Sequence, residues 1–96
     1  MVEKLLKEKE EKIDNLEKML NESNNLDNIL NEELVNITLE IDDKGKKKYS
    51  NADFRTEELK KRFGKQHEER EQLKIDIEIQ RLRIGLLTER IKFYSK

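Results

Sequence analysis

The stretch from Leu73 to Tyr94 reads LKIDIEIQRLRIGLLTERIKFY, and its apolar residues recur at short, regular intervals. One set of them keeps the seven-residue spacing of a coiled coil: Leu73, Ile77, Ile84, Leu87 and Ile91. Residues at this spacing line one face of a helix and pack against a neighbouring helix. The stretch therefore predicts a long helix with an apolar seam.

The same stretch carries a second apolar set, made of Ile75, Ile79, Leu82, Leu86 and Phe93. At about 100° per residue, the two sets lie on nearly opposite faces of the helix. One neighbouring helix covers only one of these faces, so the second set is predicted to be an oligomer or partner interface. A second copy of the chain, giving a homodimer and a four-helix bundle, is the leading interpretation. A host protein is the alternative occupant.

A second heptad tract precedes this one, with apolar residues at most a and d positions. Its a positions include Leu6, Ile13, Leu20, Leu34 and Ile41, and its d positions include Val2, Leu16, Leu30 and Ile37. Residues 42–50 contain Gly45 and no heptad apolar residue, which indicates a turn. The pattern predicts one all-α domain, an antiparallel helical hairpin (a coiled coil) with helices over about 2–41 and 51–94.

Polar interruptions of the two tracts indicate the register of the hairpin. Antiparallel pairing across this turn brings together residues whose numbers sum to roughly 93. Asp27 interrupts the first seam and Arg70 the second, and this register places them about one turn apart. We therefore expect a polar layer that sets the register.

Two local alternatives remain along the chain. The apolar residues between Val35 and Ile41 alternate with polar ones, a strand period that would start a β-hairpin ending at residues 47–50. Gly64 indicates a break near residues 64–66, which we expect to be a kink because the heptad phase continues across it. At the start of the second helix, Ser50 is the expected N-cap, with Tyr49 and Phe54 as a hydrophobic staple.

Composition restricts the class of protein. The chain has 96 residues, of which 45% are charged and only 33% hydrophobic, with no Cys and no Pro. A compact globule of this length needs more apolar side chains, whereas a helical hairpin buries only its seam. The net charge of −1 provides no global attraction to nucleic acid. No apolar run approaches the length of a membrane span, so we expect a cytoplasmic protein without a membrane partner.

The sequence contains no candidate residues for catalysis or metal binding. His67 is the only histidine, and no Cys or carboxylates surround it at metal-ligand spacing. No glycine-rich phosphate loop or nucleophile elbow occurs. We expect no catalytic, metal or cofactor site and no enzymatic activity.

Basic residues gather at two places. Candidate contacts to phosphate or to an acidic partner are Lys44, Lys46, Lys47 and Lys48 in the turn and Arg81, Arg83 and Arg90 in the second helix. The alternative is ordinary solvated charge around a coiled coil. Residues 23–43 carry no basic residue, and we interpret them first as a solvated acidic face or a complement to the basic turn of a second copy. Docking of this face into a basic protein groove is the alternative.

The region from residue 42 onward resembles small coiled-coil proteins of unassigned function encoded by bacteriophages and prophages. The matching residues are Asp43, Gly45, Lys46, Tyr49, Ser50, Asn51 and Arg55, followed by a helix, a break near Gly64 and a charged heptad helix ending in aromatics. Those relatives often have an Asp-Pro step at the break, where this chain has Gly64-Lys65. The resemblance implies a mobile-element origin beside recombination or anti-defence genes, and it carries over no binding residue.

These observations lead to a functional hypothesis. We expect a non-enzymatic phage-type coiled-coil protein that acts by protein–protein interaction, in its anti-defence form as an anti-CRISPR-like inhibitor of a host nuclease. A nucleic-acid-binding accessory to phage recombination is one alternative. A structural coiled-coil spacer is the other.

Overall fold

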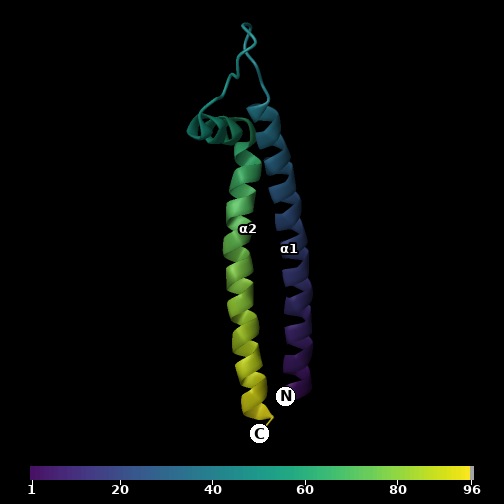
Figure 1. Ribbon diagram of the computed structural model, residues 1–96. Coiled ribbons are helices and arrows are strands. Elements are labelled where there is room, and N and C mark those ends of the chain that lie inside the picture. Colours follow the sequence, from purple (N-terminus) through teal and green to yellow (C-terminus); the bar gives the residue numbers. More distant parts are fainter. Residues whose placement is uncertain (96) are drawn as a thin grey trace. The chain divides into compact units, whose positions relative to one another are not determined.

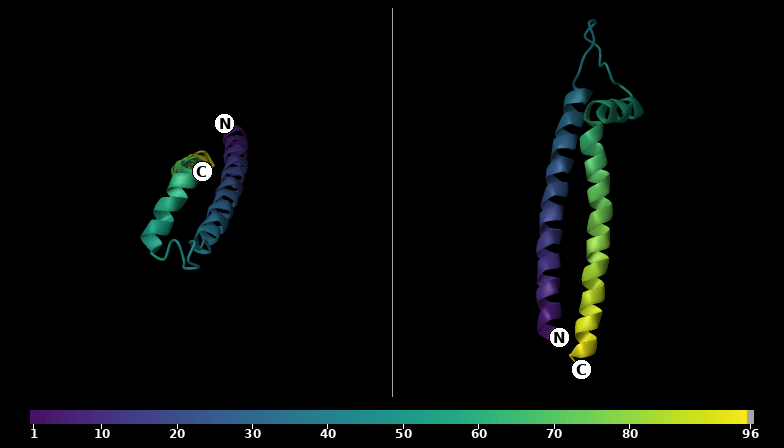
Figure 2. Two further views of the ribbon diagram at one scale, coloured as in Figure 1. Left: turned by 90° about the horizontal axis from the view of Figure 1, so that it is seen from above. Right: turned by 180° about the vertical axis from the view of Figure 1, so that it is seen from behind.

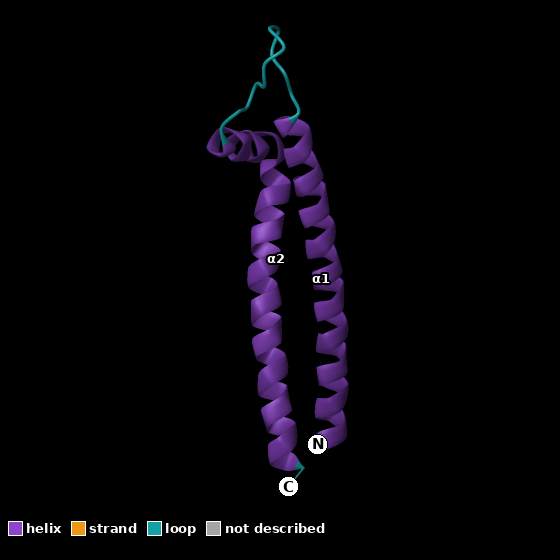
Figure 3. Cartoon of the chain, viewed as in Figure 1, coloured by secondary structure: helices purple, strands orange, loops and turns teal. Residues whose placement is uncertain are grey.

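The computed structural model describes residues 1–95, and it consists of two long helices joined by a loop (Figures 1 and 3). Helix α1 spans Val2–Thr38 and helix α2 spans Ala52–Tyr94. Among residues 1–95 there is no β-strand, only one isolated β-bridge in the loop. The predicted all-α helical hairpin is therefore confirmed, and its dimerisation stays a prediction.

The chain divides into two compact units, each built from a segment of both helices. The first unit comprises Met1–Ser23 and the part of α2 from Gln72 onward, and the second comprises Asn24–Glu71. In the first unit the α1 segment runs antiparallel to the α2 segment, and in the second unit the part of α2 after a bend does the same (Figures 1 and 2).

The core of the first unit confirms the seam predicted for α2. Ile77 and Leu87 are buried there, together with Leu5 of α1. The buried Gln80 side chain donates from Nε2 to the backbone carbonyl oxygen of Lys12 at 2.9 Å. The numbers of this pair sum to 92, which agrees with the predicted register.

The seam of α1 in this unit differs from the prediction. Leu6 and Ile13, expected at a positions of the seam, keep 45% and 36% of their surface exposed, whereas the preceding residue Leu5 is buried. The reason is that α1 has three adjoining apolar columns, because Leu5 and Met19 extend the apolar face beside the predicted a and d columns. α2 covers only part of so wide a face, and the column that begins at Leu6 lies at its edge.

The second unit has a core around Leu30, Ile37 and Leu59, with Leu34, Tyr49 and Phe63 packed against it. Helix α2 bends here, at the non-helical dihedral angles of Phe63 (φ −126°, ψ 35°). Its first segment lies across α1 instead of along it (Figure 2). The sequence placed the break at residues 64–66, yet Gly64 has no positive φ and a Cβ there would meet nothing within 4 Å. We attribute the bend to packing of Leu59 and Phe63 on α1.

The connecting loop contains a short backbone hairpin. Ile41 and Lys47 form an antiparallel bridge, and the Lys48 amide donates to the Glu40 carbonyl at 3.0 Å. Gly45, at φ 75°, makes the reversal, a conformation that side chains disfavour. The Asp42 carboxylate accepts the backbone amides of residues 44 and 46 at 2.9 and 3.0 Å.

The β-hairpin considered as an alternative for residues 35–50 is present only near the tip of this loop. Val35 and Ile37 lie in α1, so the strand-like alternation that begins at Val35 does not mark a strand there. α1 nevertheless ends at Thr38, three residues before the expected limit. The bridge at Ile41 takes the backbone out of the helix, because residues paired across a hairpin are extended.

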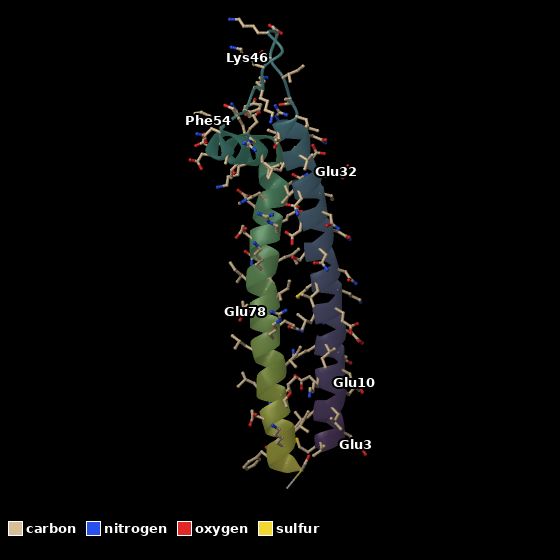
Figure 4. All side chains as sticks on the ribbon, viewed as in Figure 1. Glu3, Glu10, Glu32, Lys46, Phe54 and Glu78 are labelled. Atoms are coloured by element: carbon tan, nitrogen blue, oxygen red, sulfur yellow. The ribbon has the colours of Figure 1, made fainter. Side chains whose placement is uncertain are left out.

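The start of α2 corrects the predicted cap. The Asn51 side chain, and not Ser50, accepts the backbone amide of Asp53 at 2.7 Å, so Asn51 is the N-cap. Phe54 remains 60% exposed and Tyr49 packs into the core, so the expected staple between them is wrong (Figure 4). Moving the cap by one residue also moves the staple position from Phe54 to the next residue.

Replacing Leu30 with Ala should lower the free energy of unfolding by about 2–4 kcal/mol, because Leu30 is 1% exposed and its loss leaves a cavity. The matched control is Ile29→Ala, whose side chain is 47% exposed and should cost less than about 1 kcal/mol. Urea titrations followed by circular dichroism measure both. Equal losses for the two variants would contradict the described core.

Candidate interaction surface

The second apolar set of α2 forms an exposed stripe in the first unit, which we call the outer stripe. Its members and their exposed fractions are Ile75 (55%), Ile79 (41%), Leu82 (64%), Leu86 (66%) and Phe93 (73%). The neighbouring seam residues Ile77 and Leu87 are 7% and 4% exposed. One helix thus presents a covered and an uncovered apolar face. Figure 4 shows Glu78, which lies beside the outer stripe, pointing away from α1.

Charged residues flank the outer stripe on both sides. Asp76 and Glu78 lie beside its beginning, whereas Arg83, Arg90 and Lys92 lie beside its end. Asp76 accepts a hydrogen bond from Gln72 Nε2 at 3.0 Å. Lys92 Nζ lies 3.7 Å from the Glu89 carboxylate, where both side chains are largely exposed. An exposed ion pair of this kind contributes little to the stability of the fold. Lys92 and Glu89 can therefore contact a partner with little loss of folding free energy.

The arginines predicted as phosphate or acidic-partner contacts are all exposed on α2. Arg83 and Arg90 lie on one edge of the outer stripe, and Arg81 lies near the opposite edge of the seam. A shallow hollow between α1 and α2 is lined by Glu8, Lys12, Arg83, Leu86, Leu87 and Arg90. Its lining carries both signs of charge, so it forms no purely basic pocket.

The four predicted lysines of the turn lie in the loop of the second unit. Lys44, Lys46, Lys47 and Lys48 are all exposed, and Figure 4 shows Lys46 near the loop tip. Lys48 Nζ lies 5.6 Å from the centre of the Tyr49 ring, a cation–π distance. The structure therefore gathers these lysines in one loop and gives only Lys48 an aromatic neighbour.

An ion-pair network that the sequence did not indicate centres on Arg62. Its guanidinium binds Glu40 twice, Nη1 to Oε1 at 2.8 Å and Nη2 to Oε2 at 3.0 Å. Its Nε donates to Glu58 at 2.8 Å, and its guanidinium carbon lies 5.9 Å from the centre of the Tyr49 ring. The Glu58–Arg62 spacing is a helical i,i+4 pair that the sequence allows. The Glu40 contact was missed because it depends on the bend at Phe63.

The predicted polar layer is present in the second unit. Arg70 Nη1 lies 3.5 Å from the Asp27 carboxylate, and the Arg70 side chain is only 20% exposed. Arg70 also approaches Glu71 at 3.8 Å, while its Nε is buried without a hydrogen-bond partner. The layer therefore fixes the register more than it adds stability, because a half-satisfied buried guanidinium gains little net energy.

No family model, curated protein or solved structure matches this chain. Over residues 1–95, neither helix has an apolar stretch long enough to cross a bilayer. The same residues bring together no group of three His, Cys, Asp or Glu side chains that could hold a metal ion.

The Arg62–Glu40 pair predicts a pH-dependent stability. Hydrogen bonding to Arg62 lowers the pKa of Glu40 below its ordinary value of 4.5. A carboxyl group whose pKa is lower in the folded state stabilises that state above the unfolded pKa. The contribution is lost as the pH falls through the lowered pKa. Glu40→Gln should therefore lower the melting temperature at about pH 7, and its effect should shrink as the pH falls through the lowered pKa of Glu40.

Thermal unfolding of wild type and Glu40→Gln at several pH values measures this difference. Asp43→Asn serves as the control, because Asp43 is an exposed carboxylate of the same loop with no part in the Arg62 network. It should change the melting temperature little at any pH. A loss for Glu40→Gln that does not shrink as the pH falls would contradict the ionic role of this residue.

Proposed function

We propose that this protein acts by non-enzymatic protein–protein contact through the outer stripe of α2, and that a second copy of the chain covers the stripe in a homodimer. The observation that carries the proposal is the exposure of all five stripe residues on the face of α2 opposite the seam. At roughly 200 Å² per large apolar residue, these fractions amount to about 600 Å² per copy, the upper end for apolar patches of monomers.

The size of the stripe also agrees with a dimer. Two copies together would bury about 1,200 Å² of apolar surface, which reaches the lower limit of a standard specific interface. The stripe residues are large aliphatic and aromatic side chains, and the charges other than Glu89 lie at the edges, as in the core and rim of known interfaces.

We propose further that the protein is of phage type and has an anti-defence role, as an inhibitor of a host nuclease. The resemblance of residues 42–96 to phage coiled-coil proteins supports this assignment. Residues 24–43 of the second unit support it as well, because they contain no Lys, Arg or His. Their exposed acidic side chains include Glu32, Asp42 and Asp43, a surface suited to the basic groove of a nucleic-acid enzyme (Figure 4).

An accessory role in phage recombination is the second candidate, favoured by the four exposed lysines of the loop. Binding through phosphate contacts weakens steeply with salt. Strong, salt-dependent binding of single- or double-stranded DNA would therefore support this role and contradict the anti-defence assignment. Absence of DNA binding at low salt would eliminate it.

Light scattering should give a mass of twice the 11.6 kDa of one chain. The double variant Ile79→Asp and Leu86→Asp should reduce it to a monomer while circular dichroism retains the helical signal, because both residues lie outside the seam. Four buried aspartates per dimer would each require a large desolvation energy.

The matched control is Leu6→Asp with Ile13→Asp, which places two aspartates on exposed apolar positions of α1. This variant should remain a dimer. A monomeric wild-type protein would overturn self-association, and loss of helicity in the Ile79 and Leu86 variant would show that the two faces of α2 are wrongly assigned.

A further inference from the structure

The two ends of the outer stripe carry opposite charges at their edges. Asp76 and Glu78 flank its first half, and Arg83, Arg90 and Lys92 flank its second half, where Glu89 continues the column of Ile75 and Leu82. Neither Glu78 nor Arg83 has an ion-pair partner within residues 1–95. The flanking positions of the stripe are thus acidic beside its first half and basic beside its second half, and such an order complements itself when reversed.

We propose that two copies pair antiparallel through this stripe, α2 against α2, about a twofold axis near residues 80 and 81. The proposal rests on the self-association proposed above and adds the orientation and the contacts. The apolar face of a heptad helix consists of two columns, at the a and d positions. In an antiparallel pair, each layer places an a residue of one helix opposite a d residue of the other. Ile75 and Leu82 form one column of the stripe, and Ile79 and Leu86 form the other.

A single register satisfies all four of these residues. Ile75 lies opposite Leu86 of the second copy, and Ile79 lies opposite Leu82, since both pairs of numbers sum to 161. The twofold axis repeats each layer, so four successive layers are apolar on both sides. The next layer at each end places Glu89 opposite Gln72 of the second copy, so the four apolar layers end there and Phe93 lies beyond them.

The same register pairs opposite charges at the edge. Residues that flank a seam on the same side meet each other across an antiparallel pair. Asp76 and Arg83 flank the stripe on the same side, one heptad apart, and their numbers sum to 159, within two of the register. The dimer therefore contains this ion pair twice.

A parallel pair is disfavoured by the same charges. Parallel and in register, the acidic end of one stripe would lie beside the acidic end of the other, and the basic ends would also meet. Like charges in such positions destabilise coiled coils and set their orientation. The edge charges thus favour the antiparallel dimer over the parallel one. They also disfavour pairing with other helices that lack this acidic-to-basic order.

The antiparallel contact changes the expected shape of the assembly in the first unit. The stripe lies on the face of α2 that is nearly opposite the seam with α1. Two copies joined through it place α2 beside α2 in the middle and one α1 segment on each outer side. This arrangement is a row of four helices, whereas the four-helix bundle predicted from the sequence would share one common core.

Charge reversal tests the proposed pairing by sedimentation equilibrium. Asp76→Arg and Arg83→Asp should each weaken the dimer about tenfold, because each creates two like-charge contacts per dimer. The double variant restores both pairs with their signs exchanged, and its dissociation constant should return to within about threefold of wild type. Arg81→Asp is the control, because it makes the same charge change away from the stripe edge and should have little effect.

Spin labelling measures the orientation independently. The chain has no Cys, so Lys92→Cys carries a single label near one end of the stripe. The antiparallel register separates the two labels of a dimer along the helix axis by 23 residues, or about 35 Å. A parallel dimer would bring them within about 20 Å at the same end, since their helices lie about 10 Å apart.

The outcomes separate this inference from the function on which it rests. A label distance near 35 Å and restoration by the double variant support the antiparallel dimer. A dimer with the short label distance, or one strengthened by Asp76→Arg, overturns the orientation and leaves self-association intact. A wild-type chain that stays monomeric at high concentration overturns both proposals.

Discussion

Helix α2 has apolar residues on two nearly opposite faces, while residues 1–95 contain only one other helix to cover them. In the first unit, α1 covers the face of Ile77 and Leu87 and leaves the face of Ile79 and Leu86 in solvent. Burial of apolar surface is the main favourable term in both folding and association. The covered face accounts for the hairpin, and the uncovered face is the reason to expect a partner.

Polar contacts assign the register within each unit. Apolar seams alone tolerate shifts of one heptad, because Leu and Ile replace one another with small losses. The Gln80 bond to Lys12 in the first unit is specific to one alignment, as is the Arg70 contact to Asp27 in the second. Buried polar groups of this kind cost energy when mispaired, so they select one register among several of similar apolar burial.

Several features of the fold could be predicted from the sequence because they depend on local periodicity. The two apolar faces of α2, the reversal at Gly45 and the layer of Asp27 with Arg70 all follow from spacing along the chain. The buried column of α1 did not, because Leu5 and Leu6 both continue an apolar column and only packing decides between them. The bend at Phe63 and the Arg62–Glu40 pair likewise arise from tertiary contacts.

The position of the candidate surface could be predicted from the sequence, but the role of the charged residues beside it could not. Its five apolar residues could be predicted from helical periodicity, and their exposure agrees with that placement. The order of charges along its edges becomes meaningful only once the face opposite α1 is known, because the same residues would otherwise be scattered over the helix surface. Once this face is known, the order of charges along it indicates the orientation in which two copies pair.

The central claim is that the uncovered face of α2 is buried in solution by a second copy. Paramagnetic relaxation of the Ile and Leu methyl groups by a soluble probe measures this burial residue by residue, without altering the chain. At high protein concentration, we expect the methyl groups of Ile79 and Leu86 to be as protected as those of the seam residues Ile77 and Leu87. Methyl groups of Ile79 and Leu86 that relax as fast as the exposed Leu39 at every concentration would contradict the claim.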